Sequence, residues 1–180
     1  MVGGFLGGET QLTMNERWYR HLGVYGICTA DEKLLVIHKG KGPYKGRYDL
    51  PGGTVEANEL LTEAMKREFL EETGLHISIK KNIGVCEFVV PYALPEEEST
   101  HLHHVAVMFS VQSLSGLLAE HPEQFEGQDS LGACWVPIHE LHAANSSPLV
   151  MEAKKWLLTE QLSMESQRLD DWVILGSTNP

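Results

Sequence analysis

Runs of apolar residues along the chain predict a protein that is rich in β-strands. Residues 24–29 and 34–38 are short apolar runs, and the polar segment Ala30-Asp31-Glu32-Lys33 between them is typical of a hairpin turn. Further strands are expected, in chain order, at 48–50, 77–79, 83–90, 101–112 and 134–137.

Two segments follow a helical pattern instead. Residues 59–73 contain no glycine or proline and consist largely of strong helix formers. Asn58 is placed to cap the start of this helix, and Gly74 to end it in the left-handed conformation. Residues 148–161 form a second amphipathic pattern. Strands combined with two helices favour an α+β or mixed α/β fold, in which helices cover a largely mixed sheet.

The first helix departs from its own apolar pattern. At about 100° per residue, Leu61, Ala64 and Met65 share one side. The same stripe continues with three carboxylates, Glu68, Glu71 and Glu72. Inward-facing carboxylates at a helix C-terminus repel one another and are disfavoured by the helix dipole and by burial. Either neighbouring lysines and arginines balance a solvated acidic face, or a cation binds there, and oxygen ligands favour Mg²⁺ or Mn²⁺ over zinc.

Length and charge restrict the function. The chain has 180 residues, which suits one ordinary domain, and a net charge of −11 with neutral histidines. Such a charge argues against binding a nucleic-acid polymer, which needs a basic face. A small phosphate substrate is compatible if a cation lies between it and the acidic protein. Because no run of 18 apolar residues occurs, no membrane span is expected.

The remaining features predict a cytoplasmic domain with short tails. Three separated cysteines favour buried thiols in a reducing compartment. Residues 1–20 are expected to be a tail or lead-in, residues 21–162 the domain, and residues 163–180 a tail whose segment Trp172–Leu175 is apolar enough to dock. His101, His103 and His104 are expected to be ordinary histidines rather than a second metal site, because strand alternation turns His104 to the opposite face.

From Gly53 the sequence reads G-x5-E-x7-R-E-F-L-E-E-T-G-L, which resembles the Nudix box G-x5-E-x7-R-E-U-x-E-E-x-G-U, where U is apolar. All seven fixed positions match: Gly53, Glu59, Arg67, Glu68, Glu71, Glu72 and Gly74. Residues 50–53 before the box and residues 135–141 near the end extend the resemblance to about 22–158.

The resemblance implies an α/β/α sandwich around a mixed sheet, and hydrolysis of a nucleoside diphosphate linked to another group. It implies that Mg²⁺, with Mn²⁺ as a substitute, is bound by four residues of the box and its flank, Glu68, Glu71, Glu72 and the carbonyl of Gly52. A further acidic ligand is expected from the loop before Trp135, with Asp129 as first choice and Glu126 as second.

Other roles follow from the same resemblance. Arg67 and Glu59 are expected to orient the ligands, with Glu59 as an alternative base or outer ligand. Either Glu68 or Glu71 would take the proton of the attacking water. A basic loop precedes the box, with cations at Lys39, Lys41, Lys45 and Arg47. These side chains either contact substrate phosphates or are simply solvated. Tyr48 occupies a position where the family often has tryptophan, and is a candidate for stacking on a base.

The resulting hypothesis is a Nudix pyrophosphohydrolase acting on a nucleotide, a nucleotide sugar or a dinucleotide. One alternative is a MutT-like hydrolase that removes oxidised nucleoside triphosphates. Another is a Nudix-fold sensor that binds its ligand without cleaving it, although such sensors usually have a degraded box. The expected partner is a small phosphorylated molecule rather than a nucleic acid or a membrane, and the protein is expected to be a monomer or homodimer.

Overall fold

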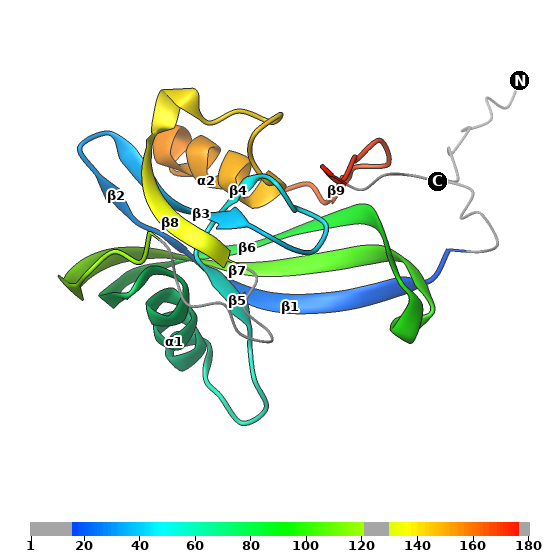
Figure 1. Cartoon of the computed structure of the whole chain (residues 1–180), viewed down its shortest axis with the longest axis horizontal. Coiled ribbons are helices and arrows are strands. Elements are labelled where there is room, and N and C mark those ends of the chain that lie inside the picture. Colours follow the sequence, from blue (N-terminus) through cyan, green and yellow to red (C-terminus); the bar gives the residue numbers. More distant parts are fainter. Residues whose placement is uncertain (1–15, 121–129, 177–180) are drawn as a thin grey trace, which may run out of the picture.

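The computed structural model describes residues 16–120 and 130–176, and it forms two sheets with a helix on either side (Figure 1). The strands are β1 (Trp18–Ile27), β2 (Thr29–Ala30), β3 (Lys33–Lys39), β4 (Tyr48–Asp49), β5 (Gly52–Thr54), β6 (Leu75–Leu94), β7 (Ser99–Gly116), β8 (Ser130–Pro137) and β9 (Gln167–Arg168). The helices are α1 (Leu61–Thr73) and α2 (Pro148–Thr159), and two short 3₁₀ turns lie at Pro95–Glu97 and Ile138–Glu140.

The larger sheet is mixed, with strand order β5-β1-β7-β6-β9. β1 runs parallel to β7 over its whole length, whereas β5 and β6 are antiparallel to their neighbours. In the smaller sheet, β3 pairs with β2, β4 and β8. Asp31 and Glu32 turn the β2–β3 hairpin with positive φ angles of 49° and 61°, as two-residue hairpin turns require. The expected mixed α/β fold is confirmed.

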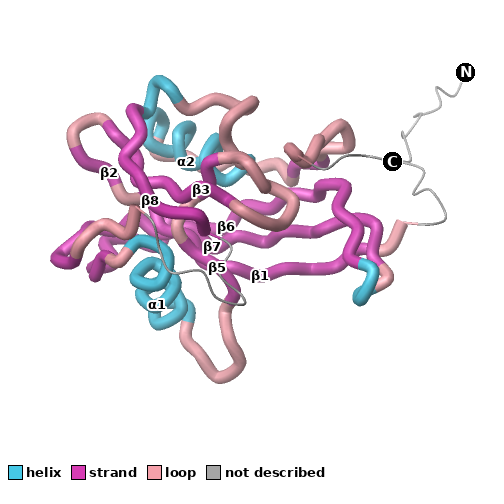
Figure 2. The backbone as a smooth tube through the Cα atoms, viewed as in Figure 1, coloured by secondary structure: helices cyan, strands magenta, loops and turns pink. Residues whose placement is uncertain are grey.

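Figure 2 shows one helix on each side of the strands. Each helix packs against its own apolar core. Alternate residues of β3 divide between them, since Leu34 and Val36 pack toward α2 while Leu35 and Ile37 pack toward α1. This division places α1 and α2 on opposite faces. Ser147 caps α2 by accepting a hydrogen bond from the Val150 amide at 3.3 Å.

The long strands β1, β6 and β7 extend beyond both helices (Figure 1). One face of this extension is covered by the C-terminal segment, residues 163–176, which we call the strap. Its strand β9 pairs with β6, and its Trp172 packs into a third apolar cluster with Tyr44, Val90 and Leu102. This cluster lies between the strap and the sheet, so the strap is part of the folded body.

Several sequence expectations need correction. The segments 77–79 and 83–90 are one bulged strand, β6, rather than two strands. Asn58 does not cap α1, because the helix begins after Leu60 and Asn58 adopts a positive φ of 64° in the preceding loop. The Leu60 amide is satisfied instead by the Glu63 carboxylate at 2.9 Å. Gly74 does end the helix in the left-handed conformation, with φ 72°.

Two further expectations concern the cysteines and membrane-spanning segments. All three cysteines are unpaired, and Cys28 and Cys86 are buried. None of the helices in the described ranges has the length and apolar character needed to cross a bilayer.

Candidate active site

α1 presents its C-terminal half to β5 and to the loop before it. The residues it buries are Ala64, Met65, Phe69, Glu72 and Thr73. Phe69, which is not part of the predicted apolar stripe, is fully buried, so the buried face of the helix is rotated from the expected one. As a result Leu61 is 37 % exposed, and the side chain of Glu71 is 46 % exposed. The expectation that all three glutamates face inward is therefore wrong for Glu71.

Glu68 and Glu72 line one polar cleft of about 130 Å³ together with Gly52 and Gly53. The Gly52 amide donates to Glu72 at 2.8 Å, which holds this buried carboxylate at the strand edge. Gly53 leaves room for the other carboxylate, since a Cβ atom there would lie 2.5 Å from Glu68 Oε2. Burial raises the pKa of Glu68, and the hydrogen bond and charge of Arg67 oppose that shift.

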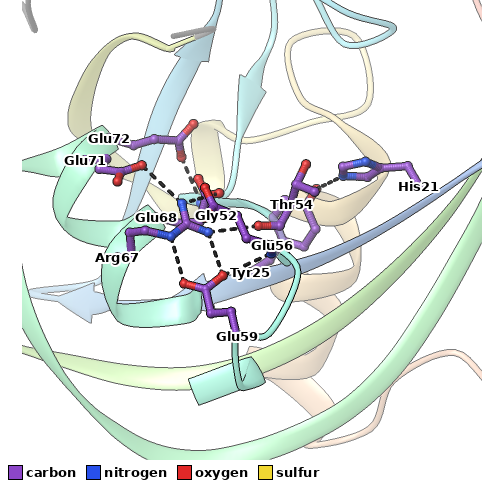
Figure 3. A network of polar contacts seen from close by, with 10 residues as sticks. All are labelled: His21, Tyr25, Gly52, Thr54, Glu56, Glu59, Arg67, Glu68, Glu71 and Glu72. Atoms are coloured by element: carbon purple, nitrogen blue, oxygen red, sulfur yellow. Dashed lines mark hydrogen bonds and ion pairs between the residues drawn. The ribbon is translucent and has the colours of Figure 1, made fainter. Parts of the chain in front are cut away.

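Arg67 is the centre of a polar network around these carboxylates (Figure 3). Its guanidinium makes a forked pair with Glu59 at 2.8 and 2.9 Å, and it also donates to the Thr54 carbonyl at 3.0 Å. It reaches Glu68 at 2.9 Å and Glu71 at 3.3 Å. Hydrogen bonds from Arg67 are the main cause that lowers the pKa of Glu59 to about 2. Arg67 and Glu59 thus hold the ends of the box together.

The donor set suits a hard divalent cation. Glu68 and Glu72 supply oxygen ligands within one cleft, and two adjacent carboxylates in partial burial need a counter-charge. Across residues 16–120 and 130–176, however, no three acidic, histidine or cysteine side chains are already gathered as a metal site. Glu71 is ion-paired with Arg67 and does not line the polar cleft, so its side chain must turn away from Arg67 to become a metal ligand. The predicted ligand Asp129 and its alternative Glu126 lie outside the described residues.

A second cleft, of about 160 Å³ and largely aromatic and apolar, adjoins the polar one. Three residues line both clefts, His21, Tyr25 and Lys39. The rest of the second cleft includes Tyr19, Pro43, Tyr44, Tyr92, Leu94 and Leu102. A cavity of about 150 Å³ holds one benzene ring, so this cleft has room for a planar ring beside the carboxylates. We call it the aromatic cleft.

Four side chains connect the two clefts in one hydrogen-bonded chain. Tyr44 Oη lies 3.0 Å from Nδ1 of the buried His104. The other ring nitrogen of His104, Nε2, lies 2.8 Å from Tyr25 Oη, so both ring nitrogens are hydrogen-bonded to tyrosine hydroxyls. Tyr25 Oη lies 3.3 Å from His21 Nε2. Burial, and then electrostatic interaction with His21, Lys39 and His103, lower the pKa of His104 well below its usual value.

The basic loop is only partly at the site. Lys39 lines both clefts, as a phosphate-binding residue would. Arg47 lines neither; it is buried, and its guanidinium lies 4.2 Å from the centre of the Trp172 ring. Tyr48 is also outside both clefts and packs against the His38 ring, with centroids 4.7 Å apart. The structure thus brings Lys39 to the carboxylates and leaves Arg47 and Tyr48 away from them.

Sequence reasoning missed the aromatic cleft. Its residues come from β1, β3, the 40–47 loop, β4, β6 and β7, and none of them belongs to the box. The available signal was the alternation of Tyr19, His21 and Tyr25 on one face of β1, together with His104 on the same face of β7. His101 and His103 lie on the other face, as expected, and His103 contacts Glu87 at 2.6 Å.

Comparisons with known proteins agree with this geometry. The NUDIX domain family matches residues 19–159. An ADP-ribose pyrophosphatase from Methanocaldococcus jannaschii is 36 % identical over 104 residues, which cover 57 % of each chain. The human 8-oxo-dGDP phosphatase NUDT18 is 31 % identical over 111 residues, covering 62 % of this chain and 30 % of that protein. The match therefore spans little more than half of the first relative and about a third of the second.

Solved structures support the fold. A NUDIX hydrolase from Nitrosomonas europaea superposes with a TM-score of 0.60 at 22 % identity, covering 80 % of this chain and 92 % of that one. A MutT NUDIX hydrolase from Burkholderia pseudomallei gives 0.56 at 21 % identity, covering 76 % and 97 %. At these identities the likeness concerns the fold alone. Because the domain match covers most of the chain and includes the complete box, this protein belongs to the Nudix hydrolase family.

Proposed function

We propose that this protein hydrolyses the diphosphate linkage of a nucleoside diphosphate derivative and depends on Mg²⁺ for this activity. The observation that carries the proposal is the junction of two clefts, one lined by Glu68 and Glu72 and the other by aromatic side chains, with Lys39 at the boundary. A charged diphosphate fits the first cleft with a cation, and a planar base fits the second.

Each side chain has a defined task in this proposal. The cation would be held by Glu68, Glu72 and the Gly52 carbonyl, and by Glu71 once its side chain has turned away from Arg67. A further ligand is proposed from the loop before β8, with Asp129 as the first choice. A bound divalent cation would neutralise the diphosphate, acidify the attacking water and stabilise the leaving oxygen. Lys39 would bind a phosphate oxygen, and Arg67 with Glu59 would keep the carboxylates oriented.

In the reaction, a water oxygen bonds to one phosphorus while the bond from that phosphorus to the bridging oxygen breaks. The water proton passes to a carboxylate, and two phosphate-bearing products leave. We assign that carboxylate to Glu68 rather than Glu71, because Glu68 lines the polar cleft while Glu71 does not and is 46 % exposed.

The test compares Glu72→Gln with Glu140→Gln, which removes the same charge from an exposed side chain far from the clefts. With a nucleotide sugar or dinucleotide and Mg²⁺, Glu72→Gln should lower kcat by a factor on the order of 10² or more, and Glu140→Gln should leave it unchanged. EDTA should abolish turnover, and Mg²⁺ or Mn²⁺ should restore it. Full activity of Glu72→Gln, or hydrolysis without metal, would refute the proposed site.

The names of the relatives favour a second candidate within the same class, hydrolysis of an oxidised purine nucleotide, because the human relative is described as an 8-oxo-dGDP phosphatase. Products separate the candidates. A linked diphosphate yields two phosphate-bearing organic products, whereas an oxidised nucleotide releases inorganic phosphate or pyrophosphate. A hydrolysis screen that scores inorganic phosphate, pyrophosphate and nucleoside monophosphate distinguishes these outcomes.

A further inference from the structure

The strap lies outside the NUDIX domain match, which ends at residue 159, yet it is firmly attached to the domain. The buried Glu152 of α2 accepts from the Ser163 hydroxyl and from the Gln167 side chain, both at 2.7 Å. Ser166 donates to Glu87 of β6, and β9 adds two residues to the sheet. These contacts place the following residues, 169–175, over the 40–47 loop.

Trp172 is the residue through which the strap contacts that loop. Its indole N–H donates to the Pro43 carbonyl at 2.8 Å. Its ring meets the Tyr44 ring edge-on, with centroids 5.7 Å apart, and covers the guanidinium of Arg47. Leu175 adds a contact at Gly46, where a Cβ atom would lie 3.1 Å from the leucine.

The opposite side of the same loop forms a wall of the aromatic cleft. Pro43 and Tyr44 both line that cleft, and Tyr44 also stacks on His104, with centroids 5.7 Å apart and planes at 20°. The loop is therefore held between Trp172 on one side and the cleft on the other. A shift of the loop away from the sheet would open the cleft and remove the Tyr44–His104 hydrogen bond.

Arg47 makes the position of the loop conditional on Trp172. Its side chain is buried, and within the described residues its Nε and Nη1 have no hydrogen-bond partner. A guanidinium with two buried nitrogens that lack hydrogen bonds gains hydration by moving into water. The Trp172 ring stabilises it in place through a cation–π contact. Without that ring, hydration of Arg47 favours an outward position of the loop.

We infer that Trp172 is a positioning residue of the substrate site, which acts through Pro43 and Tyr44 to hold the wall of the aromatic cleft against the planar ring of the substrate. The inference rests on the proposed function for the identity of that ring. It adds a segment outside the family domain to the residues that determine substrate affinity, and it leaves the bond-breaking carboxylates untouched.

The test compares Trp172→Ala, Trp172→Phe and Val173→Ala, a strap substitution at a side chain that is 63 % exposed. If the loop is in place about a tenth of the time without Trp172, KM rises roughly tenfold. Because the carboxylates are unchanged, kcat should stay within about twofold. Trp172→Phe, which keeps a ring but loses the N–H, should fall between, and Val173→Ala should match the wild type. An unchanged KM in Trp172→Ala, or a loss of kcat in that variant without a rise in KM, would overturn the inference.

Hydrogen exchange separates this inference from the proposed function, because it needs no substrate. The amides of Gly46 and Arg47 donate within the loop to Lys39 and Tyr44 carbonyls at 2.8 and 3.1 Å. They should exchange faster in Trp172→Ala, while the amides of α1 keep their wild-type rates. If the wild type hydrolyses no nucleotide, the proposed function fails, but faster exchange in Trp172→Ala still supports the role of Trp172 in holding the 40–47 loop. Unchanged exchange in the loop contradicts that role, whatever the substrate is.

Discussion

The pH dependence of protein stability can measure the cost of placing a positive charge on His104, a buried residue that lines the aromatic cleft. Its side chain is 2 % exposed and hydrogen-bonded to two tyrosines, and burial lowers its pKa well below 6.5. In the unfolded chain the same imidazole binds a proton near pH 6.5. Between these two pKa values the unfolded state holds more protons, so acidification favours unfolding.

The size of this effect follows from the linkage relation. While only the unfolded state binds this proton, the free energy of unfolding falls by about 1.4 kcal/mol for each pH unit below the unfolded pKa near 6.5, which amounts to about 2 kcal/mol between pH 7 and pH 5. The stability is fully present above pH 6.5 and is lost as the pH falls toward the folded pKa. His104→Gln removes the titrating group, and at pH 7 it should cost about 1–3 kcal/mol because a buried tyrosine hydroxyl loses its partner.

Urea unfolding of the wild type and His104→Gln at pH 7 and pH 5 measures the prediction. The stability difference between the two proteins should shrink by about 2 kcal/mol at the lower pH. His139→Gln is the matched control for the loss of a histidine, since that side chain is 83 % exposed. If His104→Gln differs from the wild type by the same amount at pH 7 and pH 5, a neutral buried His104 is refuted.

Three other substitutions probe the box and the glycine that precedes it. Gly53→Ala puts a methyl group 2.5 Å from Glu68 Oε2, a movable side-chain end, so it should lower kcat roughly a hundredfold with a stability change within about 1 kcal/mol. Gly52→Ala differs because its Cβ would lie 2.0 Å from a backbone carbonyl of β1 at φ 146°; chemical unfolding should show a loss of roughly 3 kcal/mol or more. Arg67→Lys cannot make the forked pair with Glu59, and kcat should fall about 10- to 100-fold while the melting temperature changes little. A stable, fully active Gly52→Ala, or a fully active Gly53→Ala or Arg67→Lys, would contradict the geometry of the site.

Local sequence determined the parts of the site that lie within one helical segment. Glu68 and Glu72 are one turn apart, so any helix over this segment brings their carboxylates to one side. Arg67 and Glu59 flank them at distances that a loop and a helix can close. Gly74 ends the helix because only a residue tolerant of the left-handed conformation fits there.

The same local reasoning failed where competing contacts decide the outcome. Asn58 has the right chemistry for a cap, but the helix begins two residues later because Glu63 satisfies the Leu60 amide. Glu71 belongs to the predicted stripe, but the large Phe69 ring occupies the core and turns Glu71 toward Arg67. Packing and ion pairing together fixed the phase of this helix, and neither is visible in its periodicity.

Tertiary structure decided which residues meet in the aromatic cleft and where the strap docks. His21 and His104 are 83 residues apart and become neighbours only through the parallel register of β1 and β7. Tyr44 joins them from a loop, and Trp172 reaches that loop from 129 residues beyond Pro43. The sequence by itself thus determined which carboxylates gather at the polar cleft, because those residues share one helix. Strand pairing and the docking of the C-terminal segment decided which residues line the aromatic cleft and support its wall, because such contacts depend on chain segments that no local pattern relates.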